Sequence, residues 1–191
     1  MKTLIGCVAA AILLVVQSAN AATITRDELH PFYDPDLVRY VAANGSIPAV
    51  IIANPFGAGQ DQALLTKLPM PGYLPPTTLL PTTARDRDDG HLVLIFDPVT
   101  ASNGHAAYAA PDRQTTATNA GPKAGNAKIL RLQIAFCYDA EVVSEAFMEM
   151  PRPKAPGDRE FALAMAQLLS VLLPSQNTRS AKCQGSMMGN C

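Results

Sequence analysis

The most specific chemistry in this sequence is at its C-terminus, where the last residues read CQGSMMGNC. Cys183 and Cys191 enclose Met187 and Met188, and thiolate and thioether sulfurs are the soft ligands that Cu(I) prefers. These residues are therefore candidate metal ligands. A polar terminal segment imposes no rigid geometry on a metal, however, and a disulfide between Cys183 and Cys191 would remove both thiolates. We favour the disulfide and expect no resident metal or cofactor.

A second candidate is a glycine-containing loop. Residues 50–62 read VIIANPFGAGQDQ, in which two glycines follow an apolar run, as they do in phosphate-binding loops. The segment lacks the Gly-Lys-Ser/Thr ending of a P-loop and the third glycine of a dinucleotide fingerprint. Pro55 also removes a main-chain amide, and Phe56 adds bulk where a phosphate would approach. We interpret the loop as a strand-to-helix turn with Phe56 in the core, and predict no nucleotide site.

The segment RDRDDGH is a third candidate, because it brings Asp86, Asp88 and Asp89 together before Gly90. A calcium-binding EF-hand loop places its third acid at the fifth position and glycine at the sixth. Here the glycine is already the fifth residue, and two arginines neutralise the acids. The spacing therefore favours a solvated turn.

Residues of the usual catalytic types form no recognisable motif. The histidines are far apart in the sequence and are each expected at the surface or at a loop edge: His30, His91 and His105. Glu145 and Glu149 could form a carboxylate pair with Asp139, but a solvated strand face explains them equally well. Catalytic residues are therefore unknown at this level.

The first 21 residues have the pattern of a secretory signal peptide. A lysine precedes the apolar stretch Leu4–Val16, which is too short to span a bilayer comfortably, and Ala19 and Ala21 fit a signal peptidase site. An interfacial anchor or a buried helix is the alternative. Cys7 resembles a lipobox cysteine but precedes any complete apolar region. We expect residues 1–21 to be removed and the protein to be periplasmic or secreted, soluble, and without a membrane span after cleavage.

Composition restricts the functions and folds that are open to the remaining chain, residues 22–191. Without Lys2, 14 of the 15 basic residues remain against 16 acidic ones, and these scattered charges offer no basic stripe to nucleic acid. The length suits one compact domain, and 16 prolines predict long irregular connections. Cys137 joins Cys183 and Cys191, so three disulfide pairings are open. Cys137 lies in an apolar run and is the thiol expected to stay inert.

Local patterns predict the elements of this domain. Asp34 is an N-cap before Pro35, and Asn44-Gly45 supplies a left-handed stop. Period-two alternation after Lys128 predicts a strand with one buried and one partly solvated face. The expected elements are a helix from Asp34 to Asn44, a strand over Ile47–Ala53, a helix over Gln60–Leu68, a loop over Pro69–Gly90, a strand over His91–Asp97, an irregular stretch over Pro98–Asn126, a strand over Lys128–Cys137, a strand in preference to a helix over Val142–Met150, and a helix from Asp158 to about Leu173.

These elements predict a single α+β domain over residues 22–174. We expect two layers, with a small, mainly antiparallel sheet of three or four strands covered on one face by about three helices and joined by long proline-rich loops. Residues 175–191 are expected to form a flexible polar tail that carries Cys183 and Cys191.

Three short motifs add a resemblance. NPFG follows a predicted strand, IAFC closes a later one, and the last apolar helix ends in LLP. In an exported chain, this combination resembles a group of uncharacterised exported proteins from proteobacteria. The resemblance implies no activity, cofactor or site.

Two classes of function follow from the sequence. The favoured one is a non-enzymatic envelope protein that binds a partner or a small ligand through its long loops or its solvated sheet face. The alternative is a hydrolase-like or copper-handling protein whose residues converge only in the fold. A deep pocket that gathers His91 or His105 with acidic residues would favour the enzyme, and a shallow surface would favour the binding protein.

Overall fold

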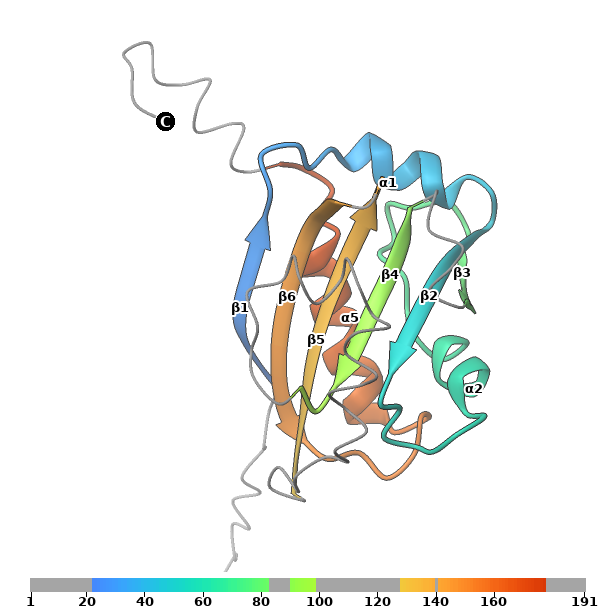
Figure 1. The fold of residues 1–191 in the computed structure, drawn as a ribbon, viewed down its shortest axis with the longest axis vertical. Helices are drawn as coiled ribbons and strands as arrows, with labels where there is room; N and C mark the ends of the chain where they lie inside the picture. The colour runs from blue at the N-terminus through green and yellow to red at the C-terminus, as the bar shows by residue number, and fades with distance from the viewer. Residues whose placement is uncertain (1–21, 83–89, 99–127, 140, 178–191) are drawn as a thin grey trace, which may run out of the picture.

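The computed structural model describes residues 22–82, 90–98, 128–139 and 141–177. Its sheet has six strands in the order β1-β6-β5-β4-β2-β3, accompanied by three helices in the described part of the chain (Figure 1). The elements in chain order are β1 (Thr23–Leu29), α1 (Pro35–Ala42), β2 (Ser46–Ile52), α2 (Asp61–Leu65), β3 (Thr78–Pro81), β4 (His91–Phe96), β5 (Ile129–Tyr138), β6 (Glu141–Pro151) and α5 (Arg159–Leu172).

The pairing within this sheet is mixed. β1, β6, β5 and β4 pair antiparallel in that order, whereas β2 runs parallel to both β4 and β3. A parallel pair needs a crossover connection, and the segment containing α2 supplies the one between β2 and β3. The predicted sheet of three or four mainly antiparallel strands was therefore wrong. With six strands and helices as a minor part, the α+β class fits only loosely.

One strand that the sequence did not reveal is β1. Its sequence, TITRDEL, has only Ile24 and Leu29 as large apolar residues, and a β-bulge between Ile24 and Arg26 shifts its register against β6. Burial still alternates along the strand, but Arg26 and Glu28 are charged residues at half-buried positions, so the alternation of apolar and polar residues that marks a strand is absent. Pairing with β6 makes this segment a strand.

The other unforeseen strand, β3, lies inside the stretch predicted as a loop. Among its four residues only Leu79 is buried, and Pro81 has no amide proton to donate. Proline is tolerated in a sheet at an edge, which is where β3 lies. The prediction of a loop over the whole of Pro69–Gly90 was therefore wrong, because the prolines exclude a central strand but not an edge strand.

The remaining described elements agree with their sequence patterns. Asp34 caps α1 by accepting a hydrogen bond from Asp36 N at 2.9 Å, and Asp158 caps α5 in the same way. Gly45 has a φ of 77°, which side-chain-bearing residues rarely adopt. The ambiguous segment Val142–Met150 belongs to a strand, β6.

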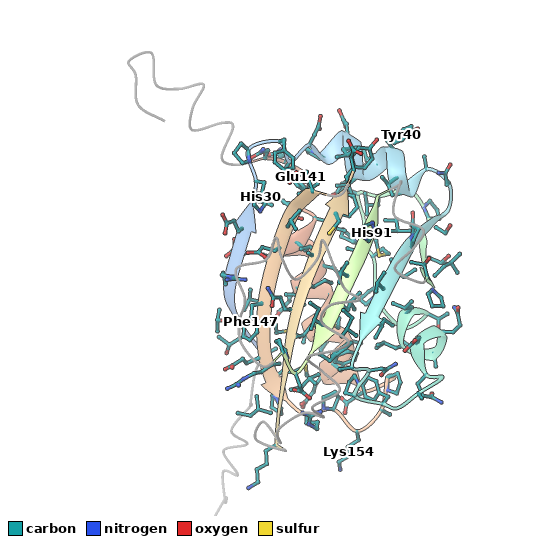
Figure 2. All side chains as sticks on the ribbon, in the orientation of Figure 1. His30, Tyr40, His91, Glu141, Phe147 and Lys154 are labelled. Atoms are coloured by element: carbon teal, nitrogen blue, oxygen red, sulfur yellow. The ribbon has the colours of Figure 1, made fainter. Side chains whose placement is uncertain are left out.

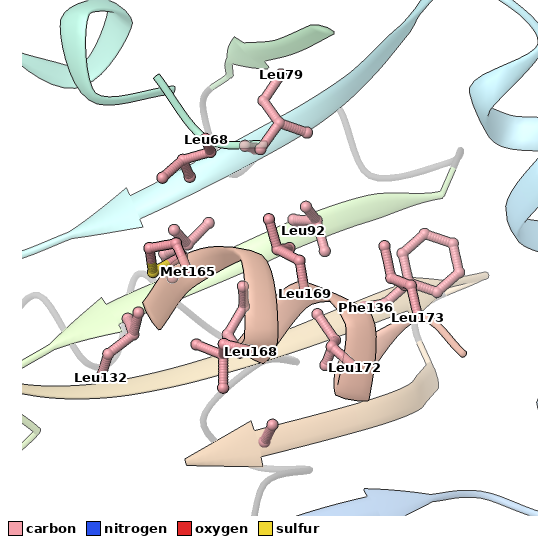
Figure 3. Packing of buried hydrophobic residues seen from close by; sticks show 14 of the residues in the cluster. Leu68, Leu79, Leu92, Leu132, Phe136, Met165, Leu168, Leu169, Leu172 and Leu173 are labelled. Carbon is pink, nitrogen blue, oxygen red and sulfur yellow. The ribbon is translucent and has the colours of Figure 1, made fainter. Parts of the chain in front are cut away.

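The main core lies between one face of the sheet and the helices. Every buried residue of α1, α2 and α5 belongs to this cluster, and α5 lies behind the sheet in the view of Figure 1. Figure 3 shows the packing of α5 on the strands, which involves Met165, Leu168, Leu169 and Leu172 of the helix and Leu92, Leu132 and Phe136 of the sheet. The helices therefore cover one face of the sheet, as predicted.

The opposite face, here called the second face, holds a smaller buried cluster made of strand residues only: Val50, Ile52, Val93, Ile95, Ala135, Cys137 and Val142. This face was expected to be partly solvated along β5. Of the four residues expected on it, Gln133, Ala135 and Cys137 are instead buried, and Arg131 is exposed. Within the described ranges, no helix combines the length and apolar character needed to cross a membrane.

Two tyrosines hold the C-terminal end of α5. Tyr33 Oη donates to the main-chain oxygen of Pro174 at 2.7 Å, and Tyr73 Oη donates to that of Leu173 at 2.9 Å. The last carbonyl groups of a helix have no partners within the helix, so these hydroxyls satisfy acceptors that would otherwise be left open. Arg39 lies over the Tyr73 ring, 5.3 Å from its centroid. The contacts join the segment before α1 and the segment before β3 to the end of α5.

Candidate functional site

Two ion pairs lie on the second face. Arg26 of β1 is 3.2 Å from Glu145 of β6, and Arg131 of β5 is 2.8 Å from Glu149 of β6. Glu145 is paired in register with Ala135, which belongs to the second-face cluster, and Glu149 follows four residues later on the same side of the strand. The charged part of this face is therefore formed by β1, β6 and β5.

The two carboxylates of β6, Glu145 and Glu149, differ in their burial and lie far apart. The Glu145 side chain is 5% exposed, so its charge depends on the guanidinium of Arg26 for compensation. Four residues of extended strand place Glu145 and Glu149 roughly 13 Å apart. Asp139 follows β5 at the end of the sheet remote from Glu149. The carboxylate pair considered from the sequence is therefore not formed, and each glutamate has its own arginine.

A third ion pair fixes the end of the sheet near Glu149. Asp97, which follows β4 with a φ of 47°, accepts a hydrogen bond from Arg152 at 2.6 Å and one from the main-chain nitrogen of Arg131 at 3.2 Å. Arg152 also donates to the main-chain oxygen of Ile129 at 3.2 Å. One carboxylate thus ties the end of β4 to β5 and to the residue that follows β6.

Beside this tied end lies a pocket of about 440 Å³, here called the β1 pocket. Its lining comes from the N-terminal end of β1, the start of β5 and the end of β6: Thr23, Thr25, Lys128, Ile129, Glu149, Met150 and Pro151. Ile129, Met150 and Pro151 provide apolar surface, and Ile129 is 37% exposed. Sites for small ligands combine apolar surface with a few polar groups in this manner.

The charge of the β1 pocket is set by Lys128. Glu149 is compensated by Arg131, whereas no ion pair joins the exposed ammonium of Lys128 to any residue that the structure describes. Thr23 and Thr25 are also exposed and bring two hydroxyl groups to the rim. The arrangement suits a ligand with an apolar part and an anionic group.

A second pocket, of about 230 Å³, lies at the opposite end of the sheet. Its lining is mostly apolar and aromatic, with two carboxylates: Phe32, Leu37, Tyr138, Asp139, Glu141 and Val143. Phe32 is 51% exposed, and its ring centroid lies 5.7 Å from that of His30. This pocket is about half the volume of the first and is bounded by the turn between β5 and β6.

Neither His30 nor His91, the two histidines in the described ranges, lines either pocket. His91, which was expected at the surface or at a loop edge, is the first residue of β4 and is only 4% exposed. It opens β4 opposite Cys137 of β5, so both side chains lie on the second face, and Cys137 is a buried thiol. His30 and His91 are labelled in Figure 2. His105 lies outside the described residues.

Metal sites were sought among the described residues, where no group of three or more histidine, cysteine or acidic side chains could hold a metal ion. The proposed copper ligands and disulfide partners lie outside the described ranges, as do the acids of the segment before Gly90: Cys183, Met187, Met188, Cys191, Asp86, Asp88 and Asp89.

The loop after β2 is a chain reversal. Asn54 Oδ1 accepts from Phe56 N at 3.0 Å, and its amide donates to Asp61 at 2.6 Å. The Phe56 ring packs edge-to-face on Phe161 of α5, with centroids 5.6 Å apart, which confirms that Phe56 anchors the turn. Gly57 has a φ of 102°, so this turn needs a residue without a side chain.

Comparison of the chain with protein-family models, curated proteins and solved structures found no match. Its function must therefore be inferred from its own residues. The sequence singled out neither Lys128 nor Thr23 and Thr25 as site residues. The only available signal was Lys128, a cation without an acidic neighbour in the sequence, at the start of the strongest strand pattern. The pocket itself forms only when β1 pairs with β6.

Proposed function

We propose that this protein is exported and acts as a non-enzymatic binding protein, with the β1 pocket as its ligand site. The observation that carries the proposal is the composition of that pocket, in which the ammonium of Lys128, without an ion-pair partner in the described part of the chain, lies beside apolar surface from Ile129 and Pro151. Such a site suits a ligand that presents a carboxylate next to an apolar group.

The ionisable groups of the domain support a binding role. Burial raises the pKa of Tyr33 and of Tyr73, but both hydroxyls bond main-chain oxygens at the end of α5, which is a structural use. The buried carboxylate of Glu145 is held by Arg26. These groups stabilise the domain.

The start of the described domain is compatible with export. β1 begins at Thr23, so cleavage after Ala21 would remove none of the sheet. It would also create a new amino group at Ala22, one residue before a residue that lines the pocket. A periplasmic or secreted protein would then present the β1 pocket with further positive charge.

Nuclear magnetic resonance tests the proposal with a minimal probe. ¹⁵N-labelled protein is titrated with N-acetyl-leucine, which has a carboxylate and an apolar side chain, and with N-acetyl-leucine amide, which lacks the charge. We expect the acid to shift the amide signals of Thr23, Ile129 and Glu149 with a dissociation constant on the order of 1 mM, typical of a fragment this small. The amide probe should bind more weakly.

Two variants make the test specific. Lys128→Met should remove the preference for the acid over the amide, because the cation that recognises the carboxylate is gone. Lys154→Met is the matched control, since Lys154 is exposed at the same end of the molecule but does not line the pocket (Figure 2). Shifts confined to other parts of the sheet, or an unchanged preference in Lys128→Met, would show that the β1 pocket is not the site.

A further inference from the structure

We infer that the ligand of the β1 pocket is a carboxylic acid that carries a hydroxyl group at the far end of an apolar body. Its carboxylate lies beside Lys128, and its apolar body covers Ile129 and Pro151. Its hydroxyl group lies between Thr23 and Glu149. The inference rests on the proposed function, since it names the class of ligand for the same pocket.

The lining of the β1 pocket is arranged in levels along three adjacent strands, β1, β6 and β5 (Figure 1). At the first level, Thr23 of β1 is paired with Glu149 of β6, and Glu149 is paired in turn with Arg131 of β5. Residues directly opposite each other on antiparallel strands share one face of the sheet. A hydroxyl, a carboxylate and a guanidinium group therefore stand in one row, and this level is polar throughout.

The next two levels differ from the first in their chemistry. Two residues further along β6, on the same side of the strand, Pro151 is paired with Ile129, which makes the second level apolar. Arg152 N donates to the main-chain oxygen of Lys128 at 2.8 Å, so the two chains stay paired as far as Lys128. The cation belongs to this third level. Lys128 precedes Arg131 by three residues, which in a strand is roughly 10 Å along the sheet.

The order of these levels fixes the order of the groups in the ligand. A molecule whose apolar body covers Ile129 and Pro151 has one end at the cation and its other end at the polar level. An acid with its hydroxyl group next to the carboxylate would leave the polar level unused when its carboxylate lies beside Lys128. The pocket, of about 440 Å³, lies within the range of about 300 to 1,000 Å³ that is usual for sites of small molecules.

The polar level favours a hydroxyl group as the second polar group of the ligand. Arg131 Nε donates to Oε1 of Glu149 at 2.8 Å, and Oε2 has no hydrogen bond within the described part of the chain. Oε2 can therefore accept a hydrogen bond from a ligand, and the hydroxyl of Thr23, on the opposite strand, can donate one. A hydroxyl group donates and accepts, whereas a carbonyl oxygen only accepts. An ammonium group only donates, and the guanidinium of Arg131 at the same level would repel it.

The experiment compares two acids that differ only at the end remote from the carboxylate. ¹⁵N-labelled protein is titrated with para-hydroxyphenylpropionate and with para-methylphenylpropionate, in which a methyl group of similar size replaces the hydroxyl. The hydroxyl compound should bind about three- to tenfold more tightly, as expected for hydrogen bonds at a partly exposed site. The amide signals of Thr23 and Glu149 should differ most between the two complexes.

A second pair of acids tests the position of the hydroxyl group. α-Hydroxyisocaproate carries its hydroxyl next to the carboxylate, and isocaproate lacks it. The two should bind equally, because a hydroxyl in that position does not reach the polar level. A gain as large as that of the para-hydroxyl compound would contradict the order of groups inferred from the levels.

Three variants assign the preference for the para-hydroxyl compound to particular side chains. Thr23→Val keeps the shape of the side chain and should reduce the preference, and Glu149→Leu should abolish it. Arg131→Gln is the matched control, because it breaks the ion pair of Glu149 but leaves the carboxylate in place, so the preference should persist.

The outcomes separate this inference from the proposed function. If the hydroxyl and methyl compounds bind equally, or if Thr23→Val and Glu149→Leu both leave the preference unchanged, the inference is wrong. A pocket that still prefers N-acetyl-leucine to its amide through Lys128 would then remain a ligand site. If no acid binds in a manner that depends on Lys128, the proposed function fails as well.

Discussion

The tyrosine contacts at the end of α5 allow a quantitative prediction. Tyr33 is 3% exposed, and Tyr33→Phe keeps its ring while removing the hydroxyl that donates to Pro174 O at 2.7 Å. The lost hydrogen bond and the carbonyl left without its partner should together lower the free energy of unfolding by about 1–2 kcal/mol. For a domain of this size, that corresponds to a fall in Tm of roughly 2–8 °C.

The effect of Tyr73→Phe should be similar but not additive. Both hydroxyls approach Pro174 O, at 2.7 Å from Tyr33 and 3.4 Å from Tyr73, so the hydroxyl that remains in a single variant can still donate to that oxygen. Urea denaturation of both single variants and the double variant measures this coupling, provided that the m value is unchanged. Tyr40→Phe is the control, because Tyr40 is 70% exposed and should give no change.

The same tyrosines predict how stability depends on pH. Burial, together with the contact between the two hydroxyls, raises the pKa of Tyr33 above its ordinary value near 10, and burial raises that of Tyr73. Above pH 10 the unfolded chain releases protons that the folded chain retains, so the unfolded state binds fewer protons and the free energy of unfolding falls as the pH rises. The double phenylalanine variant should show a shallower fall.

Two results would refute this reasoning. One is a Tyr33→Phe variant with the same urea midpoint as the Tyr40→Phe control, which would mean that the hydroxyl contributes nothing to the helix end. The other is a double variant that loses stability between pH 10 and 11 as steeply as the unsubstituted protein.

Three further predictions concern packing, capping and export. Gly90→Ala should destabilise the domain by about 1–3 kcal/mol in urea, because its Cβ would collide with the Val41 side chain, whereas Gly157→Ala, which has open space around it, should be neutral. Asp34→Ala should cost about 0.5–2 kcal/mol and reduce helical circular dichroism, since α1 loses its side-chain cap. Mass spectrometry of protein recovered from the envelope or the medium should find an N-terminus at Ala22, and a lipid-modified Cys7 would contradict the predicted cleavage after Ala21.

Much of the local structure could be predicted because its causes are local. The capping carboxylate of Asp34 acts within its own helix turn, and Gly45 ends the same helix through its own backbone conformation. The alternation along β5 and the apolar side of α5 likewise reflect burial against one surface. In each case the signal lies within a few residues of the element that it predicts.

The larger errors of the predictions made from the sequence concern contacts between distant segments. β1 is a strand because β6, more than a hundred residues later, pairs with it, and β3 is a strand because it adds to the edge of β2. Neither partner is visible from the composition of the short segment itself. His91 was expected at the surface or at a loop edge, and the sequence could not show that pairing opposite Cys137 buries it at the start of β4.

The sequence by itself determined the helices and the long strands, because these depend on neighbouring residues, and it predicts an export signal. Only the tertiary structure decided the six-stranded mixed sheet and the candidate site. The β1 pocket combines residues from the first strand with residues near positions 128 and 150, and its charge is positive only because Arg131 compensates Glu149. Such a site exists only once strand pairing has brought three separate segments to one end of the sheet.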